Sequence, residues 1–98
     1  MRYDFEWDPR KAHSNIRNHR ISFERASTIF RDPRLLSIPD KEHSENEERW
    51  ITIGIDQTGS VLVIAHTFKK VTRTAARIRI ISARKATRHE ITTYEEGI

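Results

Sequence analysis

Two arginines near the end of the chain alternate with apolar residues, in a pattern that could place guanidinium groups on one face of a β-strand. Within Ala76–Ile81, Arg77 and Arg79 alternate with isoleucines, and successive side chains of a strand point to opposite faces. A guanidinium binds phosphate through two parallel hydrogen bonds and keeps its charge when partly buried. The segment therefore predicts either a phosphate-binding sheet face or an exposed face that carries solubilising charge.

The positive charge of the chain is concentrated in its last third. The sequence has 18 Lys and Arg residues against 14 Asp and Glu, a net charge of +4. The stretch from Thr67 to His89 has no acidic residue, whereas Asp40–Glu48 is mostly acidic. A cationic block attracts polyanions such as nucleic acid and releases their counterions, but a solvated face would have the same composition. The cations of the basic stretch are Lys69, Lys70, Arg73, Arg77, Arg79, Arg84, Lys85 and Arg88.

Arg84 and Lys85 add a second indication of anion binding. Ser82 can cap a final helix that runs to about Tyr94, because serine side chains accept hydrogen bonds from the free N–H groups of a helix start. The two cations would then lie in the first turn, where they oppose the helix dipole. A bound anion at that helix start would offset the cost.

Two residues could transfer protons beside these cations. His66 closes the predicted strand Val61–His66, and an imidazole there suits general acid–base work on a phosphodiester or a structural hydrogen bond. Glu48 could take a proton from a ribose 2′-hydroxyl, or it could simply pair with Arg49. The next residue, Trp50, could stack on a base or be buried as a core aromatic.

Other catalytic classes find no support in the sequence. The chain has no cysteine, which excludes disulfide scaffolds, thiolate metal sites and cysteine nucleophiles. No histidine pair has metal-ligand spacing with a suitable carboxylate nearby. A glycine-rich phosphate loop and a serine nucleophile elbow are also missing. We therefore predict no metal and no cofactor, and we expect His19 to cap or pack at the end of a helix.

The elements that must position these residues begin with a strand and two helices. Arg2–Trp7 alternates apolar and polar residues, as a strand does. Asp8-Pro9 starts a helix over Arg10–His19, because Asp caps free N–H groups and Pro is tolerated at the first position. Its inward residues are predicted to be Ala12, Ile16 and His19. Ser22 starts a second helix, with an apolar stripe of Phe23, Ala26, Ile29 and Phe30, and Asp32-Pro33 ends it.

Strands dominate the rest of the chain. The predicted strands are Leu35–Ile38, Trp50–Ile55, Val61–His66 and Ala76–Ile81, with a turn at Asp56–Gly59. This order gives an α+β fold, with a small antiparallel sheet packed against amino-terminal helices and a carboxyl-terminal helix. The 98 residues are enough for one domain spanning 1–98. Apolar runs of about five residues are too short to span a membrane, and no signal peptide precedes the first strand, so we expect a soluble cytoplasmic protein.

Four blocks of the sequence resemble one known family. They are Phe5–His19, Ser22–Glu24, Glu48–Gly54 and Arg79–Ala86. In this order and at this separation, they resemble the BrnT family of ribonuclease toxins from bacterial type II toxin–antitoxin pairs. Arg20 departs from the family pattern, which usually has glycine after the histidine of the first helix; glycine there would permit a left-handed cap.

The resemblance implies a RelE-like fold with RNA bound across the sheet. It also implies mRNA cleavage without a metal, growth arrest, and neutralisation by a BrnA antitoxin with a ribbon-helix-helix DNA-binding part. Operator DNA would be bound only through that antitoxin.

Together, the residue patterns and the resemblance predict an endoribonuclease. The scissile phosphate would be held by Arg49, Arg79 and Arg84, and protons would be moved by His66 or Glu48. Contacts to the RNA backbone would come from Lys69, Lys70, Arg77, Lys85 and Arg88. The alternative is a non-catalytic module that binds nucleic acid or an antitoxin.

Overall fold

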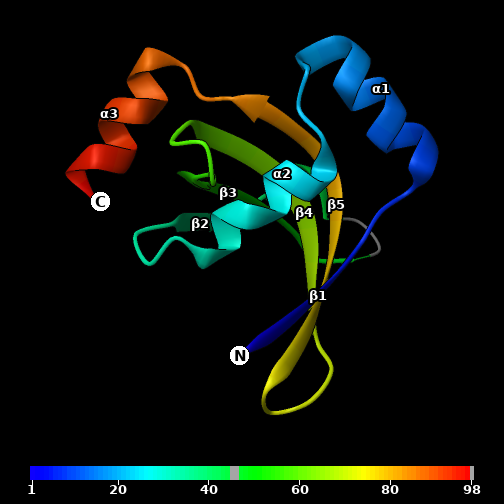
Figure 1. The fold of residues 1–98 in the computed structure, drawn as a ribbon. Helices are drawn as coiled ribbons and strands as arrows, with labels where there is room; N and C mark the ends of the chain where they lie inside the picture. The colour runs from blue at the N-terminus through cyan, green and yellow to red at the C-terminus, as the bar shows by residue number, and fades with distance from the viewer. Residues whose placement is uncertain (45–46, 98) are drawn as a thin grey trace.

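A mixed β-sheet forms the centre of the computed structural model, which describes residues 1–44 and 47–97 (Figure 1). The strands are β1 (Arg2–Glu6), β2 (Leu36–Pro39), β3 (Arg49–Ile55), β4 (Val61–Lys70) and β5 (Ala75–Lys85). The helices are α1 (Pro9–His19), α2 (Phe23–Ser27) and α3 (Arg88–Glu96), with 3-10 turns η1 (Thr28–Arg31) and η2 (Lys41–His43). Residues Glu45 and Asn46 of the acidic loop lie outside the described residues.

The sheet order is β1-β5-β4-β3-β2. The three pairings among β2, β3, β4 and β5 are antiparallel, but β1 runs parallel to β5. The predicted α+β class is therefore confirmed, with a sheet that is mostly antiparallel and has one parallel pair, β1 with β5. The first strand of the chain, β1, thus forms one edge of the sheet beside the last strand, β5.

The last helix starts later than the sequence predicted. Ser82 does not cap it: Ser82 lies within β5, opposite Ala65 of β4. The cap is Thr87, whose hydroxyl accepts from the Glu90 N–H while the Glu90 carboxylate accepts from the Thr87 N–H. This reciprocal pair satisfies two free N–H groups at once. Arg84 and Lys85 are therefore strand residues. They do not lie in the first turn of the helix, so the helix dipole gives no indication of anion binding at them.

The two faces of the sheet differ in character. One face packs against α2 and η1, around the fully buried Phe23, Ile29 and Ile64. We call this the covered face. The opposite side carries the side chains of Arg49, Thr67, Arg77, Arg79 and Ser82, and we call it the arginine face. The predicted strand Trp50–Ile55 is confirmed as part of β3, and its buried side is that of Thr52 and Gly54.

Helix α1 is attached to the sheet by a polar contact. The strand β1 pairs with β5 only as far as Glu6 opposite Arg79, so this edge of β5 has no strand partner further on. The side chain of Asn15 takes the partner's place. Its Oδ1 accepts from the Ala83 N–H at 3.0 Å, and its Nδ2 donates to the Ala83 and Ile21 carbonyls at 2.9 Å each. A buried strand edge thereby has its backbone groups satisfied.

This attachment overturns part of the predicted inward face of α1. Ala12 is half-buried and packs against the core, but Ile16 is 49% exposed and His19 is exposed as well. The residue that α1 buries is Asn15. The apolar residues of α1 did not predict its buried side, because α1 packs against the polar backbone edge of β5 and not against an apolar face of the sheet.

We predict that Asn15→Ala lowers the free energy of unfolding by about 3 kcal/mol, because it leaves a backbone N–H and two carbonyls without their partner. Chemical denaturation followed by circular dichroism measures the change. The matched control is Asn18→Ala on the exposed surface of the same helix, which we expect to stay within about 0.5 kcal/mol of wild type. Equal stability of the two variants would contradict the role of Asn15.

Arg20 ends α1 in the left-handed conformation that the family's glycine would adopt. Its φ is 60° and its ψ is 32°, and its N–H donates to the Ile16 carbonyl at 2.8 Å. The turn is therefore kept, with a non-glycine residue in a region that costs about 1 kcal/mol for an L-residue.

We predict that Arg20→Gly raises the free energy of unfolding by about 1 kcal/mol, because glycine relieves the strain at this position. Arg17→Gly in the same helix should instead lower it by about 1 kcal/mol. Thermal or urea unfolding of both variants checks the opposite signs; a loss of stability in Arg20→Gly would count against strain at this cap.

Asp32 attaches α3 to the rest of the molecule. Its side chain is buried and accepts hydrogen bonds from the Tyr94 hydroxyl, the Ile55 N–H and the Arg34 N–H. Burial alone would raise the pKa of Asp32, but these hydrogen bonds outweigh it and lower that pKa. Burial and the adjacent carboxylate raise the pKa of Tyr94 to about 12.

Among the described helices, none is long and apolar enough to cross a membrane.

Candidate active site

A hollow on the arginine face collects acidic and basic side chains. Its volume is about 540 Å³. We call it the arginine cavity, and its lining residues are Glu6, Glu47, Glu48, Thr67, Phe68, Lys69, Arg77 and Arg79. Three carboxylates and three cations therefore surround one space, an arrangement that can both bind an anion and accept a proton.

Strand register sets the positions of the main groups. Glu6 of β1 lies beside Arg79 of β5, Arg79 lies opposite Thr67 of β4, and Thr67 lies opposite Arg49 of β3. Neighbouring strands are about 4.8 Å apart, so the Cα atoms of Arg49 and Arg79 are separated by roughly 10 Å. The next pair along β4 and β5 is Lys69 and Arg77. The cations of this face thus come from three adjacent strands.

Arg79 already has an anionic partner. Its guanidinium forms an ion pair with the Glu47 carboxylate, and the two side chains are 40% and 43% exposed. An exposed pair of this kind contributes at most about 1 kcal/mol. A phosphate that binds two N–H groups of Arg79 can therefore displace Glu47 at small cost.

The structure brings together four of the residues that the sequence selected. Glu48, Lys69, Arg77 and Arg79 all line the arginine cavity. Arg49 is outside this lining but lies in the same row across the sheet.

Arg84 lies elsewhere on the arginine face. It pairs with Val63, four residues along β4 from the partner of Arg79, which is a distance of roughly 13 Å. Its two terminal nitrogens donate to the Glu90 carboxylate at 2.8 and 2.9 Å. These hydrogen bonds lower the pKa of Glu90 to about 2. Arg84 therefore connects β5 to α3, and it is not part of the group around Arg79.

Three of the predicted RNA contacts do not line the arginine cavity. Lys70 and Lys85 lie opposite Ala76 and Leu62, at register positions that belong to the covered face. Arg88 is an exposed residue at the start of α3. Sequence proximity grouped them with Arg79, but the alternation of β-strands sends neighbouring side chains to opposite faces.

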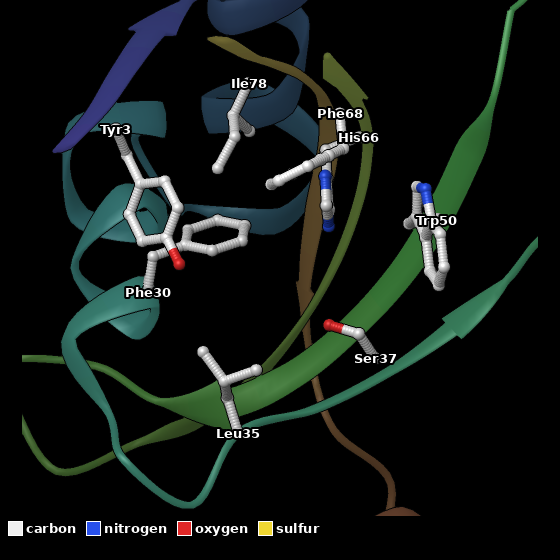
Figure 2. Close-up of a pocket in the computed structure, with 8 residues that line it drawn as sticks. All are labelled: Tyr3, Phe30, Leu35, Ser37, Trp50, His66, Phe68 and Ile78. Atoms are coloured by element: carbon white, nitrogen blue, oxygen red, sulfur yellow. The ribbon is translucent and has the colours of Figure 1, made fainter. Parts of the chain in front are cut away.

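His66 is buried on the covered face, with 2% of its surface exposed. Its Nε2 is 2.6 Å from the Thr52 hydroxyl, and its Nδ1 is 3.0 Å from the Thr67 carbonyl oxygen. The imidazole lines a pocket of about 220 Å³ whose walls are largely apolar (Figure 2). The Phe30 ring packs edge-on against it, with 5.0 Å between the two ring centroids. The expectation that His66 works beside the cations is therefore not met, because the sheet itself separates it from Arg79.

Burial lowers the pKa of His66 below its ordinary value of 6.5. The unfolded chain then binds a proton that the folded protein does not, so the stability present above pH 6.5 is lost as the pH falls below it. We predict a decrease of up to about 1.4 kcal/mol per pH unit in the free energy of unfolding. Urea denaturation between about pH 8 and pH 5 measures it. His66→Gln should remove this component, whereas the exposed His13→Gln should retain it.

Two carboxylates of the cavity were missed in the sequence. Glu6 reaches Arg79 only because β1 and β5 pair in parallel, a contact between distant segments that no local pattern signals. Glu47 stood in the acidic loop as one acid among several, and its pairing with Arg79 could have been suggested only by the opposite charges of the two segments. Among the described residues, no group of His, Asp and Glu has a geometry that could hold a metal ion.

Comparison with known proteins agrees with the arrangement of strands and helices. A family model described as ribonuclease toxin, BrnT, of type II toxin–antitoxin system matches residues 7–90. The crystal structure of the ribonuclease toxin BrnT from Brucella abortus superposes with a TM-score of 0.59 at 21% sequence identity, covering 90% of this chain and 100% of that one. At this identity, the superposition shows a common fold. Comparison with curated proteins gives no significant sequence match. With most of its length matched by the family model, the chain belongs to the BrnT family of ribonuclease toxins of type II toxin–antitoxin systems.

Proposed function

We propose that this protein cleaves mRNA without a metal ion and that the arginine cavity is its active site. The observation that carries the proposal is the presence of Glu48 beside Lys69, Arg77 and Arg79 in one hollow on the sheet. A carboxylate and several fixed cations are the groups that phosphodiester cleavage through the ribose 2′-hydroxyl requires.

In the proposed reaction, the Glu48 carboxylate takes the proton of the 2′-hydroxyl. The 2′-oxygen attacks phosphorus, the bond from phosphorus to the 5′-oxygen breaks, and the leaving 5′-oxygen takes a proton from solvent. The products are a 2′,3′-cyclic phosphate and a 5′-hydroxyl. Arg79 offers two N–H groups to the phosphate oxygens, whose negative charge increases in the transition state.

The remaining cations have supporting roles in this proposal. Arg77 and Lys69 form the next pair along the same strands and would contact the phosphate that neighbours the scissile one. Arg49, in the row of Arg79, would contact the backbone on the β3 side. Such contacts strengthen binding without selecting a base sequence.

The family implies an antitoxin partner, and we propose a BrnA-type protein with a ribbon-helix-helix part that would bring operator DNA to the complex. Support comes from apolar side chains exposed at the sheet, Ile38 at 62% and Ile55 at 39%. Ile38 adjoins the cationic rows, because it pairs with Ile51 and Ile51 follows Arg49 by two residues, whereas Ile55 lies at the far end of β3. A partner segment with acidic and apolar residues would complement both parts of the surface.

We predict that Arg79→Ala lowers the rate of RNA cleavage by about 10²–10³-fold, the usual effect of removing a donor to developing negative charge. Glu48→Gln should lower it by a similar factor or more, because the general base is lost. The assay uses a defined RNA with EDTA present, and gel electrophoresis resolves the fragments. Arg73→Ala, which removes an exposed cation from the β4–β5 loop, is the matched control.

Circular dichroism of each variant separates catalytic loss from unfolding. Cleavage by Arg79→Ala at the wild-type rate would overturn the assignment of the active site. Tight RNA binding by the wild type without any fragments, in EDTA and in added Mg²⁺ alike, would favour the non-catalytic binding module instead.

A further inference from the structure

A second polar hollow lies between α1 and the free edge of β5. Its volume is about 460 Å³. We call it the α1 cleft, and its lining residues are Asp8, Arg10, Lys11, Ser14, Asn15, Asn18, His19, Ile81 and Ser82. None of these residues lines the arginine cavity.

The cleft exists because a side chain replaces a strand at this edge. β1 stops opposite Arg79, and beyond that point only the Asn15 amide reaches the backbone of β5. Residues three and four apart share one helix face, so the turns on either side of Asn15 present Lys11 and Asn18 along the same strand edge. The polar stripe of α1 thus faces the sheet and leaves a space that the protein itself does not fill.

The lining of the α1 cleft is cationic and rich in hydrogen-bond donors. Its one carboxylate, Asp8, caps α1 by accepting from the Arg10 N–H at 2.8 Å, and its contact with the Arg10 side chain is long, at 3.6 Å. Lys11 has no salt bridge in the described part of the chain. The ammonium group of Lys11, the Ser82 hydroxyl and the His19 imidazole are therefore open to an anionic ligand.

The two hollows follow each other along the same strands. Ser82 lies on the arginine face three residues after Arg79 in β5. On the neighbouring segment, Glu6 lines the arginine cavity and Asp8, two residues on, lines the α1 cleft. Two residues of extended chain span roughly 7 Å. A polyanion with regularly spaced phosphates can therefore occupy both hollows at once.

We propose that the α1 cleft is a second RNA-binding subsite, in which Lys11, with His19 and Ser82, holds a backbone phosphate of the nucleotides that flank the scissile bond. The inference rests on the proposed function, since it takes RNA at Arg79 as its reference point. It assigns affinity for longer RNA to α1 and the bond-breaking step to the arginine cavity.

The test measures binding of a fully 2′-O-methylated, single-stranded RNA, which cannot be cleaved through its 2′-oxygen. Fluorescence anisotropy gives the Kd at several salt concentrations. Each phosphate contact to single-stranded nucleic acid contributes about 0.7 to the slope of log affinity against log salt. For Lys11→Ala we expect a slope smaller by about 0.7 and an affinity roughly three- to tenfold lower at low salt. Lys41→Ala, an exposed cation outside both hollows, should behave as wild type.

Cleavage kinetics provide the second measurement. For an RNA of ten or more nucleotides, Lys11→Ala should raise KM and leave kcat unchanged, because the cleft does not contact the reacting atoms. For a dinucleotide, which reaches only the arginine cavity, Lys11→Ala should match wild type in both constants. His19→Gln, which keeps a hydrogen-bond donor but removes the imidazole, should raise KM for the long RNA by a smaller factor.

The possible outcomes separate this inference from the proposed function. If Lys11→Ala keeps the wild-type salt slope while Arg79→Ala loses cleavage, the subsite is wrong and the active site stands. If Lys11→Ala has a smaller slope of log affinity against log salt while Arg79→Ala cleaves normally, the subsite stands and the proposed active site is wrong. If Lys11→Ala weakens binding of the antitoxin but not of RNA, the cleft docks an acidic protein segment and the RNA subsite is overturned.

Discussion

The organisation of this protein depends on one amide side chain that completes a strand edge. Asn15 offers a donor and an acceptor to the backbone of Ala83, as a neighbouring strand would. Because buried backbone groups need partners, the contact determines where α1 can lie. It also determines what α1 leaves open, since a single side chain fills less space than a strand. The α1 cleft is therefore a direct consequence of how the sheet edge is satisfied.

The sheet separates two kinds of polar chemistry. On the covered face, the hydrogen bonds of His66 are met by Thr52 and by a backbone carbonyl, and burial keeps the imidazole neutral. On the arginine face, Arg79 forms an ion pair with Glu47 in which both side chains are partly exposed to solvent. A buried, fully satisfied histidine stabilises a fold, whereas partly exposed arginines bind ligands. This difference is why we propose the arginine face, and not the covered face, as the location of the active site.

Helix α3 is held mainly by polar contacts, which occupy the charged side chains of Arg84 and Asp32. Arg84 is committed to Glu90, and Asp32 is committed to Tyr94 and to the backbone of β3. The sequence selected Arg84 as a phosphate ligand, whereas it assigned Asp32 only to the end of a helix. Arg84 joins β5 to the helix that follows it, through a residue six positions on, whereas Asp32 joins α3 to a segment 62 residues away. The position of an arginine on this sheet face is therefore not enough to place it in the candidate site.

The sequence by itself determined the family, the α+β class and most elements, because apolar alternation, the Asp8 and Ser22 caps and the helix-ending proline are local signals. It also selected Glu48, Lys69, Arg77 and Arg79 as candidates, and alternation within one strand predicted the shared face of Arg77 and Arg79. Only the tertiary structure decided that the His66 side chain lies on the covered face and that Arg84 is hydrogen-bonded to α3. It also decided that Glu6 and Glu47 lie beside Arg79. Strand pairing brings Glu6 to Arg79, and a side-chain ion pair brings Glu47 there from the loop before β3. The parallel partner of β1 and the extra length of β5 were equally beyond local patterns, because they depend on hydrogen bonds between segments distant in sequence.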